Sequence, residues 1–130
     1  MSDTTTNPHP GRPVSWFEIG TPDAAAAQAF YGQVFGWSFA QDGEYVLVTA
    51  GGEGPSGGIQ DTTLSGHPGR PDRYAVICIE VPDVAASCVA AEDAGGKVLV
   101  PSQTMDTGLS FAYITDPAGN QVGLFSPPAS

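Results

Sequence analysis

Two side chains that could take part in chemistry occupy equivalent places in a pattern that the sequence contains twice. Glu18 lies in the segment 14–23 and Cys78 in the segment 74–83, at an offset of 60 residues. A carboxylate that is partly removed from water could transfer a proton, and a thiolate could act as a nucleophile if a base lay beside it. The repeat therefore offers one candidate acid or base and one candidate nucleophile.

Each of these side chains also has a purely structural interpretation. Glu18 could hydrogen-bond a backbone amide or a tyrosine hydroxyl, or face solvent at an edge. Cys78 stands in an apolar run and Cys88 in an alanine-rich one, so both are predicted to be buried, reduced thiols. The histidines, His9 and His67, fall in a predicted tail and a predicted connector, and neither is placed to serve Cys78 as a base.

A strand that ends in Pro-Asp and an alanine-rich helix make up the first half of each repeat. Pro-Asp at 22–23 and at 82–83 is followed by helix-forming segments without internal proline, predicted over 24–35 and 84–94. Asp23 and Asp83 are suitable N-caps, and glycines stand at equivalent places behind the helices, Gly36 and Gly96.

Each predicted helix has a single apolar side to bury. On the first helix this side is formed by residues at helical spacing, Ala27, Phe30, Tyr31 and Val34. Its two aromatic members, together with the nearby Phe35, are assigned to the core. On the second helix the apolar side contains Val84, Cys88 and Ala91.

Three strands are predicted after each helix. The first set covers 37–41, 44–50 and 57–61, with a hairpin turn at Asp42-Gly43; the second set covers 97–101, 111–115 and 121–125, with a turn at 116–120. The order is therefore βαβββ followed by a second βαβββ, which is an α+β fold.

The predicted organisation is one domain over residues 13–126. Module one covers about 13–61, a connector that crosses the surface covers 62–72, and module two covers about 73–126. Residues 1–12 and 127–130 are rich in Pro, Ser, Thr and Gly and are predicted to be tails. A chain of 130 residues fits one such domain with one site.

Charge and hydropathy exclude two classes of partner. Four basic residues against 14 acidic ones give a net charge of −10, which would repel a nucleic-acid backbone. No apolar stretch is long enough to span a bilayer, and the N-terminus lacks the apolar core of a signal peptide, so neither membrane association nor secretion is expected. A cytoplasmic location is the resulting expectation.

Several motifs resemble the vicinal-oxygen-chelate superfamily, which includes glyoxalase I, bleomycin-resistance proteins and extradiol dioxygenases. They are Trp16-Phe-Glu-Ile, Ala29-Phe-Tyr31, Phe35-Gly-Trp37 and Asp116-Pro-Ala-Gly-Asn120, within a resemblance that covers 14–126. The resemblance implies that the two modules form a cupped mixed β-sheet with helices outside and a ligand pocket inside. It also implies a homodimer by analogy, and in some members the modules pair between chains.

The same resemblance locates the positions at which metal-dependent members hold a divalent ion. These positions fall on Trp16, Val76 and Gly123, which cannot coordinate, and within 57–60, where Gln60 is at best a weak neutral donor. A subset of the family shares a Trp at the first position and an ending like Gly123-Leu-Phe125. We therefore expect no metal and no other cofactor.

The alternation of side chains along strands predicts which residues face the cup. Trp16 and Glu18 share one face of the first strand, while Phe17 and Ile19 face the helix. The predicted ligand-binding set is Trp16, Glu18, Tyr74, Val76, Cys78, Tyr113 and Gly123, with Glu18 as the catalytic candidate. Further aromatic residues that could line the cup are Trp37, Tyr45 and Phe111.

Three functions are compatible with this sequence. The first is a metal-independent glyoxalase-like or bleomycin-resistance-like protein that binds a small aromatic or apolar molecule between its modules. The second is a metal-free lyase or isomerase in which Glu18 moves a proton. The third is a protein interaction module whose cup is filled by its own side chains. Whether any reaction is catalysed stays open at this point.

Overall fold

The computed structural model describes residues 11–64 and 69–128. Module one contains the strands β1 (Val14–Thr21), β2 (Ser38–Asp42), β3 (Tyr45–Thr49) and β4 (Gly57–Asp61) and the helix α1 (Ala24–Phe35). Module two contains the strands β5 (Tyr74–Glu80), β6 (Lys97–Thr104), β7 (Ser110–Thr115) and β8 (Gln121–Ser126) and the helix α2 (Val84–Asp93). The predicted βαβββ repeat is confirmed.

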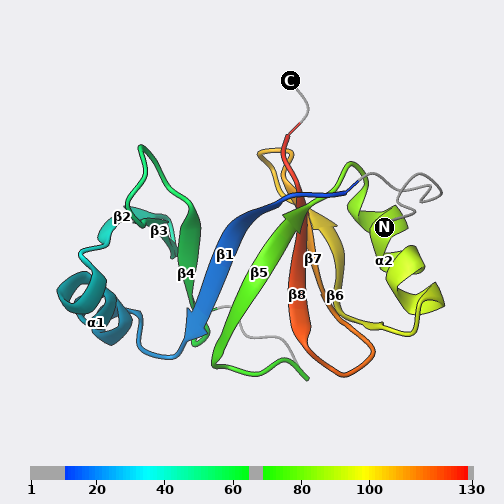
Figure 1. Cartoon of the computed structure of the whole chain (residues 1–130), viewed down its shortest axis with the longest axis horizontal. Coiled ribbons are helices and arrows are strands. Elements are labelled where there is room, and N and C mark those ends of the chain that lie inside the picture. The colour runs from blue at the N-terminus through cyan, green and yellow to red at the C-terminus, as the bar shows by residue number, and fades with distance from the viewer. Residues whose placement is uncertain (1–10, 65–68, 129–130) are drawn as a thin grey trace, which may run out of the picture.

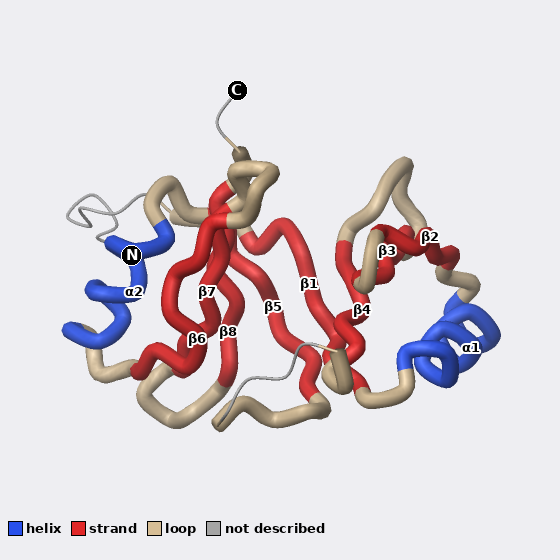
Figure 2. The backbone as a smooth tube through the Cα atoms, turned by 180° about the vertical axis from the view of Figure 1, so that it is seen from behind, coloured by secondary structure: helices blue, strands red, loops and turns tan. Residues whose placement is uncertain are grey.

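The two modules join into one mixed sheet of eight strands in the order β2-β3-β4-β1-β5-β8-β7-β6. The modules meet where β1 pairs antiparallel with β5, so they pair within one chain. Parallel pairs flank this junction on each side, β1 with β4 and β5 with β8. The sheet curves strongly, and the helices lie at its opposite ends (Figures 1 and 2). The α+β class predicted from the sequence is confirmed.

Two apolar clusters hold the helices against one face of the sheet. Val84 and Cys88 of α2 are buried with Ala112 of β7 and Leu124 of β8. In module one, Val46, Val48 and Ile59 form the buried centre of the second cluster, against which Phe17, Ile19, Ala24 and Ala27 pack. The residues that alternate with these along the strands face the other side, where Glu18 lies.

The predicted burial of α1 is wrong for most of its apolar residues. Phe30, Val34 and Phe35 are all more than half exposed, at 54%, 54% and 59%. The helix approaches the sheet mainly through its first turns, and its aromatic residues pack on one another and on Trp37 instead, with the rings of Tyr31 and Trp37 stacked at 5.0 Å. Ile77 on β5 is likewise exposed, because neither helix covers the centre of this face.

Strand β6 runs three residues beyond its predicted end at Pro101. Proline lacks an N–H, so it normally ends a paired strand. Here the register between β6 and β7 shifts between Val100 and Gln103, so Pro101 lies in an irregular stretch where no donor is required. Among the described residues no helix is both long and apolar enough to cross a membrane.

Both helices begin at the predicted caps. The carboxylates of Asp23 and Asp83 accept hydrogen bonds from Ala26 N and Ala86 N, each at 3.0 Å. Gly36 ends α1 in the left-handed conformation with φ 72°, which glycine adopts at low cost.

Replacing Asp83 with alanine should lower the free energy of unfolding by about 1 kcal/mol, because an orphan N–H of α2 loses its acceptor. Urea unfolding followed by circular dichroism measures the change. Asp93, in the last turn of the same helix, provides the control, since its replacement by alanine removes the same charge without removing a cap. An equal loss for both variants would contradict the capping role.

Candidate functional site

The concave side of the junction between β1 and β5 brings the predicted site residues together. Glu18 pairs across the sheet with Val76, Trp16 pairs with Cys78, and Gly20 pairs with Tyr74. On the far side of β5, Cys78 pairs with Gly123 of β8, and Gly123 pairs with Tyr113 of β7. All seven residues predicted to bind the ligand therefore lie on one face of the sheet.

Glu18 is the centre of a hydrogen-bonded network and is only 5% exposed. Its Oε1 accepts hydrogen bonds from the hydroxyls of Tyr113 at 2.8 Å and Tyr45 at 3.1 Å. Its Oε2 accepts from Tyr74 at 2.5 Å and from Tyr113 at 3.0 Å. The indole N–H of Trp16 donates to the Tyr45 hydroxyl at 3.1 Å and extends the network to a fifth side chain.

Arg70 supplies the positive charge that a buried carboxylate requires. Its Nη2 lies 3.4 Å from Glu18 Oε2, and its Nε donates to Oε1 of Gln121. The guanidinium carbon lies over two aromatic rings, 3.5 Å from the ring centre of Tyr113 and 4.0 Å from that of Tyr74. The Arg70 side chain is 5% exposed, so the prediction of a surface-crossing connector is wrong at this residue.

Glycines make room for the rings of the network. A Cβ atom at Gly58 would collide with the ring of Tyr45, and one at Gly20 would collide with the ring of Tyr74. At Gly123 it would lie 2.9 Å from the sulfur of Cys78 and 3.4 Å from the Tyr113 ring. The tyrosines can therefore lie flat across neighbouring strands and aim their hydroxyls at Glu18.

Burial and the charge of Glu18 make the neighbouring groups hard to ionise. Loss of solvation is the larger cause and the Glu18 carboxylate the second, and together they raise the pKa of Tyr45, Tyr74 and Tyr113. The same two causes, in the same order, raise the pKa of the Cys78 thiol to about 12. Cys78 is therefore a neutral thiol at physiological pH, and the structure disfavours its nucleophilic role.

Cys78 in the folded protein should resist alkylation by iodoacetamide at about pH 8, because the thiolate is the reactive form. Mass spectrometry after labelling with and without denaturant measures the modified fraction at each cysteine. Protein unfolded in urea supplies the control, in which both Cys78 and Cys88 should react. Rapid labelling of Cys78 in the folded protein would show that its thiol is activated.

The residues at three of the family's metal-ligand positions carry no donor side chains in the part of the chain that the structure describes. The positions at which the resemblance implies ligands hold an indole, an isopropyl group and a glycine whose missing side chain leaves space already taken by Cys78. The oxygens of Glu18 already accept from three hydroxyls and a guanidinium. Within residues 11–64 and 69–128 no three His, Cys, Asp or Glu side chains converge, and His9 and His67 lie outside these ranges.

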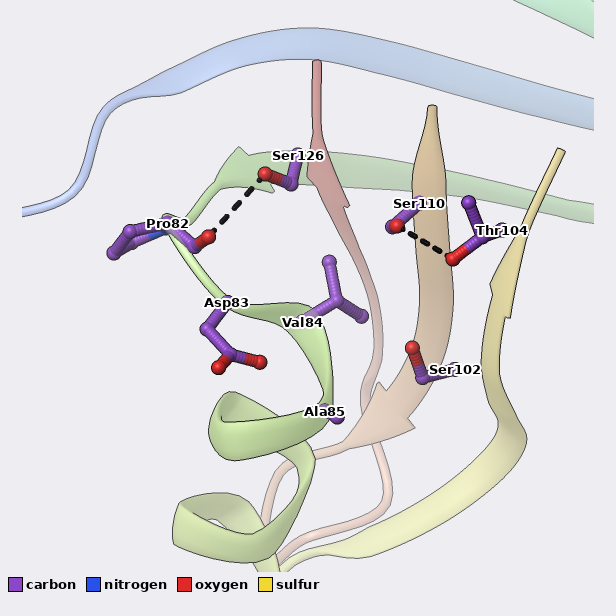
Figure 3. A pocket seen from close by; sticks show the side chains of 8 residues that line it. All are labelled: Pro82, Asp83, Val84, Ala85, Ser102, Thr104, Ser110 and Ser126. Atoms are coloured by element: carbon purple, nitrogen blue, oxygen red, sulfur yellow. Dashed lines mark hydrogen bonds between the residues drawn. The ribbon is translucent and has the colours of Figure 1, made fainter. Parts of the chain in front are cut away.

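A groove elsewhere on the molecule does not share residues with this network. It has a volume of about 230 Å³ and lies where α2 begins, beside β6, β7 and β8. Half of the residues that line it carry a hydroxyl group, as Figure 3 shows: the lining is Pro82, Asp83, Val84, Ala85, Ser102, Thr104, Ser110 and Ser126. Two of the hydroxyls, Thr104 and Ser110, hydrogen-bond one another at 2.9 Å, and Ser126 donates to the Pro82 carbonyl.

The sequence did not indicate Arg70 or Gln121, and Tyr45 was not in the predicted ligand-binding set. Only four residues in the chain are basic, so a buried Glu18 has few candidate partners, and this scarcity was a usable signal for Arg70. Trp37 is predicted to line the cup, but it packs against the apolar cluster of module one, where its ring centre lies 5.4 Å from that of Phe17.

Comparison with known proteins agrees with this architecture. The model of the Glyoxalase/Bleomycin resistance protein/Dioxygenase superfamily matches residues 14–124. The chain therefore belongs to this superfamily, as the sequence motifs had indicated.

Two curated relatives are each 30% identical to this chain. One is CFP32 of Mycobacterium bovis, which its name presents as a candidate glyoxylase; the match covers 85% of this chain and 44% of the relative. The other is the anthracycline biosynthesis protein DnrV of Streptomyces peucetius, with 85% and 45% covered. The chain thus spans less than half the length of these relatives.

A solved structure shares the fold at low sequence identity. It is a methylmalonyl-CoA epimerase variant from Streptomyces coelicolor in complex with 2-nitronate-propionyl-CoA, with a TM-score of 0.56 and 16% identity over 90% of this chain and 95% of that chain. Members of this fold therefore bind small molecules, including coenzyme A derivatives.

Proposed function

We propose that this protein binds a small molecule with an aromatic or apolar body on the concave face of its sheet, without a metal and without catalysing a reaction. The observation that carries this proposal is the complete use of Glu18 by neighbours inside the protein. Three tyrosine hydroxyls and one guanidinium surround its two oxygens, which together have about four acceptor sites.

A general base must present a free lone pair to the proton that it removes. Both Glu18 oxygens are occupied, because each already accepts hydrogen bonds from tyrosine hydroxyls. The arrangement fits a fixed structural role for Glu18 better than proton transfer, and this is the structural interpretation already considered from the sequence. We call Glu18 and the four side chains that donate to it, Tyr45, Tyr74, Tyr113 and Arg70, the platform. The lyase or isomerase alternative is therefore the weaker one.

The aromatic side chains in and around this platform that are only partly buried, Trp16, Tyr74 and Phe111, could contact an aromatic ligand. Phe111 lies beside Tyr113 on the same strand face, with ring centres 6.0 Å apart, and Trp16 and Tyr74 border the carboxylate. Aromatic faces favour flat ligands at low entropic cost. The name of DnrV connects a relative to anthracyclines, which are flat polycyclic molecules, and the family name includes bleomycin resistance. The first name indicates a class of molecule, and the second includes a resistance role that ligand binding can supply.

A titration with an anthracycline, daunorubicin, tests the proposal. Saturable quenching of tryptophan emission is expected, and replacing Trp16 with phenylalanine should remove most of it, because Trp16 borders the platform. Trp37→Phe is the matched control, since Trp37 packs on the opposite face of the sheet. Bleomycin and the neutral aromatic 1-naphthol complete the panel. If none of the three probes gives saturable, Trp16-dependent quenching, the proposed function is wrong.

The oligomeric state and the cellular location remain predictions. A homodimer is expected by analogy with the family, and light scattering coupled to size-exclusion chromatography would measure it. A cytoplasmic location is also a prediction, which a fusion to a fluorescent protein would check.

A further inference from the structure

The Arg70 side chain occupies the concave face in the way that a ligand would. It enters from the segment that precedes β5, places its guanidinium over two aromatic rings, and reaches a buried carboxylate. Planar cations are attracted to aromatic faces and to carboxylates for the same electrostatic reason, and guanidinium is the natural example. The surroundings of Arg70 therefore have the composition of a binding site for a planar cation.

The hydrogen bond between Arg70 and Glu18 is long and involves only one nitrogen of the guanidinium. A guanidinium can donate two parallel hydrogen bonds to a carboxylate, usually at 2.7 to 2.9 Å. Arg70 offers Glu18 one nitrogen at 3.4 Å and directs its Nε to Gln121 instead. A free cation without this tether could take a shorter and better aligned position over the same rings.

We propose that the Tyr74, Tyr113 and Glu18 cluster is a subsite for a planar cationic group, an amidinium or guanidinium, and that Arg70 fills this subsite until a ligand displaces it. This inference rests on the proposed function and refines it: the ligand has a flat cationic head in addition to its aromatic or apolar body. The net charge of −10 favours the approach of such a ligand.

Benzamidinium and benzamide are a matched pair of probes for this subsite, because they have nearly the same shape and only the first carries a charge. Their dissociation constants would be measured by tryptophan fluorescence and calorimetry for the wild type and for Arg70→Ala. Removing Arg70 should tighten benzamidinium binding by roughly tenfold or more and leave benzamide binding little changed.

Two further variants identify the origin of the gain. Arg73→Ala removes the same charge from an exposed side chain that pairs with Asp72 outside the cluster, so it should show no gain. Glu18→Gln combined with Arg70→Ala should lose the preference for benzamidinium over benzamide. An equal gain in Arg73→Ala, or a preference that persists without Glu18, would overturn the inference.

The test also holds if Arg70→Ala does not fold by itself. Benzamidinium, and not benzamide, should then restore the folded circular dichroism spectrum, and failure of both probes to do so would overturn the inference. Failure here is distinct from failure of the proposed function. A wild type that binds daunorubicin while Arg70→Ala gains nothing for benzamidinium loses only the cation subsite, whereas the reverse result loses only the binding of flat aromatic ligands by the native protein.

Discussion

Replacing Glu18 with glutamine is expected to lower the free energy of unfolding by about 3–5 kcal/mol. Arg70 would then be an uncompensated charge at 5% exposure, and three tyrosine hydroxyls would lose a charged acceptor. Urea unfolding followed by circular dichroism measures the loss. The effect should be large because a buried ion pair costs most when one partner is removed and the other stays.

The double variant Glu18→Gln/Arg70→Ala separates this mechanism from simple damage to packing. Because the second change removes the stranded cation, the double variant should be more stable than the sum of the two single losses predicts, which a double-mutant cycle quantifies. Additive losses would show that Glu18 and Arg70 do not act as a pair. The single variant also separates binding from catalysis: a protein that needs Glu18 as a proton carrier would lose turnover while keeping most of its ligand affinity.

The protein is expected to unfold steeply in alkaline solution. Tyrosine normally has a pKa of 10.0 and cysteine 9.0, and in the folded protein the pKa of Tyr45, Tyr74, Tyr113 and Cys78 is raised above these values. The unfolded chain therefore releases these protons first, so stability is fully present below about pH 9 and is lost as the pH rises further. Each group contributes a slope of about 1.4 kcal/mol per pH unit once its unfolded form has ionised.

Urea unfolding at a series of values from about pH 8 to about pH 11 would measure this slope. Tyr113→Phe removes one buried titrating hydroxyl, so the variant should be less stable near neutral pH but lose stability less steeply above pH 10. Tyr31→Phe, on α1 and outside the network, is the control. A stability that does not change across this range would contradict the assignment of neutral, buried tyrosines around Glu18.

Short sequence patterns were sufficient to predict most of the fold. The offset of 60 between the two Pro-Asp motifs was enough to place the start of both helices, since N-caps depend on neighbouring residues, and a glycine in the left-handed conformation follows each helix, Gly36 after α1 and Gly95 after α2. Alternation along β1 was enough to assign Phe17 and Ile19 to the helix side and Glu18 to the other. These features depend on a few neighbouring residues, so one sequence is sufficient to read them.

The features that one sequence could not supply depend on contacts between distant segments. Arg70 is 52 residues from Glu18, and nothing in its neighbourhood distinguishes an inward-pointing arginine from one in a solvated connector. The helical spacing of Phe30 and Val34 predicts one apolar side but not whether the sheet extends far enough to cover it. The place of Tyr45 beside Glu18 requires the pairing of β3 with β4 and of β4 with β1.

The junction of β1 and β5 has a consequence for how this duplicated chain can change. Its one buried carboxylate belongs to the first copy, while two of its three phenols come from the second copy and its cation from the segment between them. Neither copy holds the complete network. The two copies therefore share the same order of strands and helices but contribute different side chains to the site. A substitution of a network residue in one module is therefore expected to require a compensating substitution in the other module.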